Sequence, residues 1–271
     1  MDSARRKQYL DALGIEPWQQ RTQAPAQPPE VTAPVGNPGN AVETAPVFPQ
    51  SPNMPPKFKT PLPAAALEPP PARSPEPAFE VPTTWEGLRP AVAGCMRCKL
   101  CKTRTNTVFG VGLETASLMV VGEGPGADED QQGEPFVGRA GKLLDEMLKA
   151  IGRSRKEQAP EKSVFIANVV KCRPPGNRDP EADEVEACRP YLDQQIRLVK
   201  PKLIVALGRI AAQRLLGTDA PLSKLRGPVH EYGPDKTPLL ITYHPAYLLR
   251  SPGEKAKSWT DLKRVHQLLK A

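Results

Sequence analysis

Residues 117–130 read SLMVVGEGPGADED, a short apolar run with β-branched side chains that leads into a glycine-rich, acidic loop. Its length and composition predict a buried strand from Ser117 to Gly122. Comparable apolar runs follow at Val164 to Val170 (VFIANVV), Leu203 to Leu207 (LIVAL) and Leu239 to Tyr243. Amphipathic or charged stretches predict helices over Gly141 to Ile151, Pro180 to Lys200, Arg209 to Leu216 and Ser258 to Leu269.

This alternation of apolar strands with helices predicts an α/β fold. We expect three layers, α/β/α, around a central, mostly parallel four-stranded sheet, because strands buried on both faces need helices on either side. Ligands bind outside the carboxyl ends of the strands in such sheets. The residues directly after each strand are therefore the first candidates for chemistry.

The chain of 271 residues changes character along its length. Of its 34 prolines, 18 fall between Thr22 and Pro82. A segment so rich in proline, with few large apolar residues, predicts a disordered, extended linker over residues 22–82. The folded domain is expected over residues 83–271, which hold 30 Lys and Arg against 22 Asp and Glu. This positive balance favours a polyanionic partner.

Residues 1–21 contain a short amphipathic peptide, with Tyr9, Leu10, Leu13 and Ile15 at near-helical spacing. On a long tether such a peptide is expected to dock on another protein, and a frayed helix without a partner is the equal alternative. Its arginine pair, its LGI and its Trp followed by Arg resemble the N-terminal peptide of the psi subunit of the bacterial clamp loader. That resemblance implies a replisome or clamp-loader partner.

The sequence predicts a cytoplasmic protein. It has no run of about eighteen apolar residues, so neither a transmembrane helix nor a membrane partner is expected. The polar N-terminus does not resemble a signal peptide. In a reducing compartment the five cysteines favour a metal site or reactive thiols over disulfides. Cys95-x-x-Cys98 together with Cys172 and Cys188 suits either zinc or an iron–sulfur cluster.

Polar residues accompany three of the predicted strands. The nearest match to a nucleotide phosphate loop, Gly133 to Gly138 followed by Arg139-Ala140, lacks both the lysine and the hydroxyl. In the loop after the first strand, Glu129 stands where a dinucleotide fingerprint needs its third glycine. Asn168 lies in an apolar strand, where its amide is costly to bury without a partner, and His244 follows the last strand. Each residue alone has an ordinary structural explanation. Together, at one edge of a sheet, they predict an active site.

Six motifs carry a family resemblance: CMRCKLCKTRTNTVFG from Cys95, GEGPGADED, GEPFVGRAG, NVVKCRPPGNRDP, Cys188 and HPAYLLR. Together they resemble family 4 uracil-DNA glycosylase, the iron–sulfur type of bacteria and archaea, over essentially all of the predicted domain. The resemblance implies a [4Fe-4S] cluster on Cys95, Cys98, Cys172 and Cys188, and Cys101 has no counterpart among those ligands. It also implies a monomeric, nucleoid-associated hydrolase that excises uracil from DNA and leaves an abasic site in base excision repair.

The resemblance also implies roles for single residues. His244, Glu123 and Asn168 would be catalytic: His244 donating to uracil O2, Asn168 reading O4 and N3–H, and Glu123 positioning the attacking water. Phe136 would stack on the flipped base and Glu129 would shape the pocket against the methyl group of thymine. The substrate-binding residues would be Gly124, Glu129, Phe136, Asn168, His244, Leu248 and Arg250, with Leu248 filling the vacated space in the duplex and Arg250 binding phosphate.

A second hypothesis comes from another functional class. Basic charge and clustered cysteines also suit a non-catalytic, metal-stabilised nucleic-acid-binding adaptor associated with replication. A pure binder has no need of Asn168 and His244 at a shared sheet edge, so the arrangement of polar residues favours the enzyme.

Overall fold

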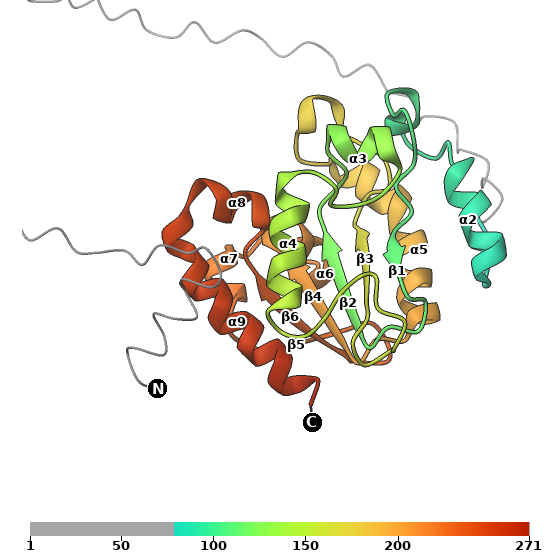
Figure 1. Ribbon diagram of the computed structural model, residues 1–271. Helices are drawn as coiled ribbons and strands as arrows, with labels where there is room; N and C mark the ends of the chain where they lie inside the picture. The colour runs from blue at the N-terminus through green and yellow to red at the C-terminus, as the bar shows by residue number, and fades with distance from the viewer. Residues whose placement is uncertain (1–78, 271) are drawn as a thin grey trace, which may run out of the picture. The chain divides into compact units, whose positions relative to one another are not determined.

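Six strands form one sheet within residues 79–270, the part of the chain that the computed structural model describes (Figure 1). Their order across the sheet is β1-β3-β2-β4-β6-β5. The strands are β1 (Val111–Gly112), β2 (Leu118–Gly122), β3 (Val164–Asn168), β4 (Leu203–Leu207), β5 (His230–Tyr232) and β6 (Thr237–Thr242). The predictions for residues 1–21 and for residues 22–78 lie outside the described residues.

The four predicted strands are the four central ones, and they are parallel. β2 pairs with β3 and β4, and β4 pairs with β6. The sheet is larger than the predicted four strands, because β1 and β5 add antiparallel edges. These edge strands have only two and three residues and are partly exposed, so they contain no apolar run that could have revealed them.

The four predicted helices are present, with ends shifted by up to three residues. The helices are α2 (Trp85–Ala93), α3 (Ala127–Gln132), α4 (Arg139–Lys149), α5 (Ala182–Val199), α6 (Gly208–Leu216), α7 (Leu222–Leu225), α8 (Pro245–Arg250) and α9 (Lys255–Leu268), with 3₁₀ turns η1 (Lys99–Lys102), η2 (Pro175–Asn177) and η3 (Pro252–Glu254). Within the described residues, none of them is both long enough and apolar enough to cross a membrane.

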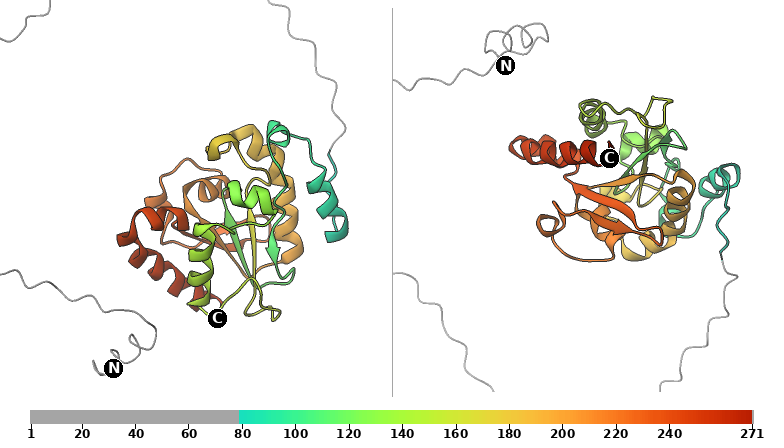
Figure 2. Two further views of the ribbon diagram at one scale, coloured as in Figure 1. Left: turned by 45° about the horizontal axis from the view of Figure 1, so that its top comes forward. Right: turned by 90° about the horizontal axis from the view of Figure 1, so that it is seen from below.

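Alternate residues of the central strands enter two separate cores, which makes the molecule three-layered. Met119 and Val121 of β2 belong to the core shared with α2, α5 and α6. Leu118 and Val120 belong to the core shared with α4 and α9. Figure 2 shows α5 and α9 on opposite sides of the sheet. Every residue of β2, β3 and β4 is buried, as expected for parallel strands covered on both faces.

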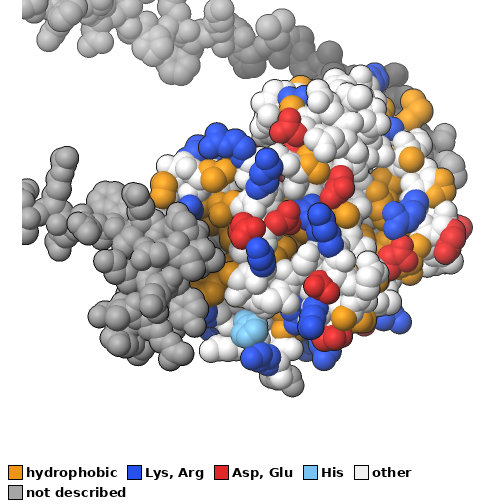
Figure 3. All heavy atoms as spheres, in the orientation of Figure 1, with side chains coloured by type: hydrophobic (Ala, Val, Ile, Leu, Met, Phe, Trp, Pro, Cys, Tyr) orange, Lys and Arg blue, Asp and Glu red, His pale blue; other side chains and the backbone are white. Residues whose placement is uncertain are grey.

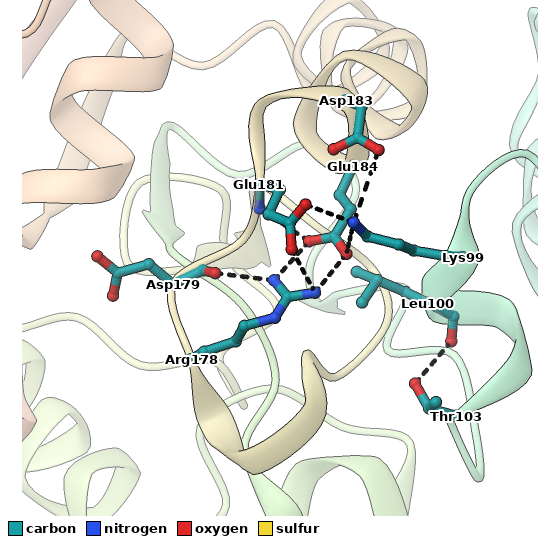
Figure 4. A network of polar contacts seen from close by, with 8 residues as sticks. All are labelled: Lys99, Leu100, Thr103, Arg178, Asp179, Glu181, Asp183 and Glu184. Carbon is teal, nitrogen blue, oxygen red and sulfur yellow. Dashed lines mark hydrogen bonds and ion pairs between the residues drawn. The ribbon is translucent and has the colours of Figure 1, made fainter.

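The start of α5 is fixed by a network of ion pairs (Figure 4). The fully buried carboxylate of Glu184 accepts bonds from both terminal nitrogens of Arg178, at 2.6 and 2.9 Å, and one from the backbone N–H of Glu181 at 2.8 Å. Arg178 thereby holds the pKa of Glu184 below its usual value. Lys99, from η1, pairs with Glu181 and lies 3.9 Å from Asp183. The side chain of Lys99 thereby joins η1 to the start of α5.

Contacts of the domain begin before its predicted first residue, Thr83. The Phe79 ring packs edge-on against Tyr191 of α5, with ring centroids 5.4 Å apart. The guanidinium of Arg97 lies 3.8 Å from the centre of the same ring. Phe79, which the composition assigned to the linker, therefore packs on the folded domain.

Candidate active site and cysteine cluster

A cavity of about 440 Å³ opens at the carboxyl ends of β2, β3 and β6. This is the sheet edge at which the sequence predicts the active site. The cavity is lined by the predicted residues Glu123, Gly124, Glu129, Phe136, Asn168, His244 and Arg250. Residues 177–179 and α8 contribute further to its wall.

Asn168 is the last residue of β3 and is only 1% exposed. Its backbone carbonyl accepts a hydrogen bond from the buried Lys171 Nζ at 2.9 Å. Its side-chain oxygen Oδ1 has no hydrogen-bond partner within residues 79–270. A Cβ atom at Gly122, its partner on β2, would lie 2.4 Å from that oxygen, so only glycine leaves room for the carboxamide. The carboxamide is thus a buried acceptor at the floor of the cavity.

Phe136 forms the wall beside Asn168. Its ring is 7% exposed and its centroid lies 5.6 Å from that of His244, with 33° between the two planes. Its backbone has φ +56°, a left-handed conformation that is uncommon for a residue with a side chain. The ring also covers Gly122, where a Cβ would lie 2.6 Å from Phe136 Cζ. The cavity therefore has a flat aromatic wall at this point, on which a planar ring could stack.

Glu129 lines the cavity, and its carboxylate already accepts hydrogen bonds from the backbone. It accepts the backbone N–H groups of Gly126 at 3.1 Å, Val137 at 3.0 Å and Gly138 at 3.2 Å. The carboxylate thus holds the glycine loop after β2 against the segment that carries Phe136. Its expected effect on the thymine methyl group stays a prediction.

His244 is the N-cap of α8, and this position sets its hydrogen bonding. Nδ1 accepts the backbone N–H of Ala246 at 3.2 Å, so the proton of the neutral ring is on Nε2. Burial lowers the pKa of His244 to about 4, helped by the charge of Arg250. Gly208, at φ +86°, passes so close that a Cβ there would lie 2.9 Å from His244 Cβ. At neutral pH the ring is an uncharged hydrogen-bond donor.

Glu123 follows β2, and its pKa is raised, whereas that of His244 is lowered. Burial and, to a lesser extent, the charge of Asp179 raise the pKa of the Glu123 carboxyl group to about 7, against the lowering effect of Arg209. Asp179 and Arg209 form an ion pair of 2.7 Å. Glu123 is therefore close to half-ionised at neutral pH, as suits a general base.

The structure does not place Leu248 at the cavity, and its expected role in filling the vacated space of the duplex stays a prediction. Leu248 is 1% exposed and does not line the cavity, because it shares the buried face of the one-turn helix α8 with Pro245, three residues earlier. Residues on the other face of α8 are open to solvent. Tyr247 is 37% exposed and lines the cavity, as does Arg250.

Three contributors to the site were missed by sequence reasoning. Asp179 and Tyr247 lie inside the quoted motifs NVVKCRPPGNRDP and HPAYLLR, but no role was drawn for either. Arg209 follows β4, so the rule that strand ends carry function could have identified it.

The cysteines surround a second, smaller cavity. It is lined by Cys95, Cys98, Cys101, Cys172 and Cys188, and all five are free thiols. These residues come from the segment between α2 and β1, which includes η1, from the segment after β3, and from α5. As they stand, no three Cys, His, Asp or Glu side chains between residues 79 and 270 are grouped closely enough to hold a metal ion.

The surroundings of these thiols nevertheless fit a metal site in their chemistry. Arg104 Nη1 lies 3.1 Å from Cys172 Sγ, and the backbone N–H of Lys171 donates to Cys188 Sγ at 3.2 Å. Hydrogen bonds of this kind support ligating thiolates. Burial raises the pKa of the Cys188 thiol to about 12, so it ionises only when a metal displaces its proton. The donor set therefore fits a thiolate-bound metal or cluster.

Comparison with known proteins places the chain in a family. Residues 109–263 match the model of the uracil DNA glycosylase superfamily. The chain is 44% identical over 189 residues to the type-4 uracil-DNA glycosylase of Sulfurisphaera tokodaii, covering 68% of this chain and 84% of that protein. It is 45% identical over 184 residues to the type-4 uracil-DNA glycosylase of Archaeoglobus fulgidus, covering 65% and 89%. The type-4 uracil-DNA glycosylase of Thermotoga maritima is 44% identical over 183 residues, covering 66% and 91%. The chain therefore belongs to the uracil DNA glycosylase superfamily, as a type-4 member.

Proposed function

We propose that this protein removes uracil from DNA by hydrolysing the N-glycosidic bond, leaving an abasic site without cutting the strand, in base excision repair. The observation that carries the proposal is the Asn168 side-chain oxygen, which lies buried at the cavity that Phe136 also lines and has no hydrogen-bond partner among residues 79–270. Leaving such an acceptor unpaired costs about 1–3 kcal/mol, and an N–H of a bound base would recover that free energy. The names of the type-4 relatives support the same substrate.

The carboxamide of Asn168 selects uracil by its hydrogen-bonding pattern. Uracil presents an N3–H donor and an O4 acceptor, which complement the side-chain oxygen and amino group of an asparagine. Cytosine presents an acceptor at N3 and a donor at N4, so it would leave both polar groups of the buried carboxamide mismatched. A mismatch of this kind, inside a site that excludes water, discriminates strongly.

His244 stabilises the departing base. As the glycosidic bond breaks, negative charge develops on uracil, and a donor placed at O2 stabilises that charge where it forms. The Nε2–H of the neutral ring supplies this donor, because Nδ1 is already bonded to the Ala246 N–H. The low pKa keeps the ring uncharged at neutral pH.

Glu123 acts on the other reactant. In its ionised form the carboxylate orients the attacking water and stabilises the positive charge that develops on the sugar. Its raised pKa makes this ionised form more abundant as the pH rises through 7.

The uridine must leave the duplex to enter the cavity. Tyr247 is exposed at the cavity and takes the place of Leu248 as the side chain that contacts the neighbouring bases. Its ring is supported by Tyr243, with centroids 5.1 Å apart. On the described part of the face in Figure 3, Lys and Arg alternate with Asp and Glu. Phosphate binding is therefore proposed for single residues at the cavity, Arg250 first.

We infer that Cys95, Cys98, Cys172 and Cys188 hold a [4Fe-4S] cluster, with Cys101 outside the ligand set. When bound, the cluster supplies a structural cross-link, since hydrolysis transfers no electrons. The contacts of Arg104 and of the Lys171 N–H with the sulfurs support this assignment. We also propose that residues 1–21 dock on a replication protein, and that the enzyme acts as a cytoplasmic monomer. A pull-down with the full chain and with a chain lacking residues 1–21 tests the docking, and an unchanged set of partners would refute it.

The excision activity is tested with the full chain and a labelled oligonucleotide containing one uracil, beside a matched one containing thymine. We expect alkali-labile sites only in the uracil strand, and no strand cleavage before alkali. The absence of uracil-dependent abasic sites from protein with a loaded cysteine site would overturn the proposal.

A further inference from the structure

The backbone of Phe136, in its left-handed conformation, is bonded by Arg155, a side chain that does not itself line the cavity. We propose that Arg155 is a positioning residue that sets the Phe136 ring against the flipped base and thereby sets the affinity of the site for uracil. This inference rests on the proposed function and concerns how the same site is shaped.

Arg155 lies in the segment between α4 and β3 and is 9% exposed. Its Nη1 donates to the carbonyl of Pro135 at 2.7 Å, and its Nη2 donates to the carbonyl of Phe136 at 3.1 Å. On its other edge, Nε donates to Asp145 of α4 at 2.9 Å. A guanidinium makes these bonds in one plane, so the two carbonyls are oriented together relative to α4.

Side chains bind both the carbonyl groups and the N–H groups of the backbone around Phe136. Arg155 binds the carbonyls of residues 135 and 136, and Glu129 binds the N–H groups of residues 137 and 138. The backbone also packs tightly on α4, since a Cβ at Gly141 would lie 1.8 Å from the Phe136 carbonyl oxygen. A strained backbone at a site persists when its surroundings over-determine it. Arg155 contributes to these constraints by fixing the carbonyls of residues 135 and 136.

The chain contains a matched control for Arg155. Arg153 lies two residues earlier in the same segment and is also 9% exposed. Its Nη1 donates to Ser117 Oγ at 2.6 Å, at the far end of β2 from the cavity. Removing either arginine deletes a buried cation from this segment, but only Arg155 contacts the Phe136 backbone.

The experiment compares the variants Arg155→Met, Arg155→Lys and Arg153→Met with the wild-type full chain. It measures the dissociation constant of free uracil, the single-turnover excision rate and the melting temperature. Arg155→Met is expected to weaken uracil binding roughly tenfold and to slow excision by roughly 10- to 100-fold, as for other misplaced catalytic geometry. Arg155→Lys should recover part of this loss, and Arg153→Met should change uracil binding less than about twofold.

A double-mutant cycle with Phe136→Leu separates positioning from general stabilisation. If Arg155 acts through the ring, Arg155→Met should cost little further affinity once the ring is gone, because coupled residues are not additive. Equal losses of uracil binding for Arg155→Met and Arg153→Met, or an undiminished loss from Arg155→Met in the Phe136→Leu protein, would overturn the inference. Were Arg155→Met to fail to fold, Arg155→Lys would carry the same cycle. A wild-type chain without uracil excision would instead refute the proposed function.

Discussion

The two sides of the cavity are built on different physical principles. Asn168 and Phe136 are uncharged, and their places are fixed by strand register and by backbone contacts. Glu123 and His244 are titratable, and burial moves their pKa values in the directions that suit their roles, up to about 7 and down to about 4. In the proposed mechanism, selection of the base depends on shape and pairing, whereas bond cleavage depends on the protonation states of Glu123 and His244. Mutation and pH should therefore affect the two sides separately.

The largest effect is expected from His244→Ala. Removing a donor to developing charge costs ~3 kcal/mol, or roughly a hundredfold in rate. Binding of free uracil should change far less, because the charge forms only during cleavage. The measurement is the single-turnover excision rate beside the dissociation constant of uracil.

His230→Ala is the matched control for that variant. His230 lies on β5, where its Nε2 contacts the carbonyl of Leu225 at 2.8 Å, and it does not line the cavity. A loss of rate equal to that of His244→Ala would show that both histidines act on stability alone.

Asn168→Ala tests the selective side of the cavity. We expect a loss of uracil affinity of about 2 kcal/mol, roughly thirtyfold, from the missing hydrogen bonds. The melting temperature should stay constant or rise, because the variant removes a buried acceptor that has no hydrogen-bond partner in the described part of the chain. A marked fall in melting temperature without loss of uracil binding would assign Asn168 to the fold instead.

The pH profile should report the titratable side alone. With a pKa of about 7, Glu123 is ionised in about a tenth of the molecules at pH 6 and in about nine tenths at pH 8. The single-turnover rate should therefore rise about tenfold over this range, while His244 stays neutral throughout. Glu123→Gln should remove the slope, and a wild-type profile that is flat from pH 6 to 8 would exclude Glu123 as the base.

Variants of the Asp179–Arg209 ion pair test whether the pH profile reports Glu123. Asp179 raises the pKa of Glu123 and Arg209 lowers it. Asp179→Asn should move the midpoint of the pH profile down, and Arg209→Gln should move it up. Shifts in the same direction for both variants would contradict the assignment of the profile to Glu123.

The smallest effect on activity is expected at the rim. Tyr247→Ala should weaken binding of uracil-containing DNA severalfold and leave the melting temperature unchanged, since the side chain is exposed. Leu248→Ala should instead lower the free energy of unfolding by about 2–5 kcal/mol, as for other buried leucines. The reverse pattern would restore Leu248 as the residue that enters the duplex.

Much of this comparison could be read from the sequence, and the exceptions have physical causes. The buried parallel strands are continuous apolar runs, and their order along the chain brought Asn168 and His244 to one sheet edge. The orientation of Leu248 was not readable, because a helix of one turn is too short to show an apolar period. Arg155 was missed because a charged residue in a connecting segment gives no pattern, and its proposed positioning role depends on two carbonyls about twenty residues away.

The absence of a side chain at Gly122 also predicts the phenotype of a mutation at this position. One added carbon there would collide with both Asn168 Oδ1 and the Phe136 ring, at 2.4 and 2.6 Å. A Gly122→Ala allele would thus disable both uncharged walls at once. Cells carrying it would retain uracil left by cytosine deamination, and because uracil templates adenine, their genomes would accumulate C-to-T transitions.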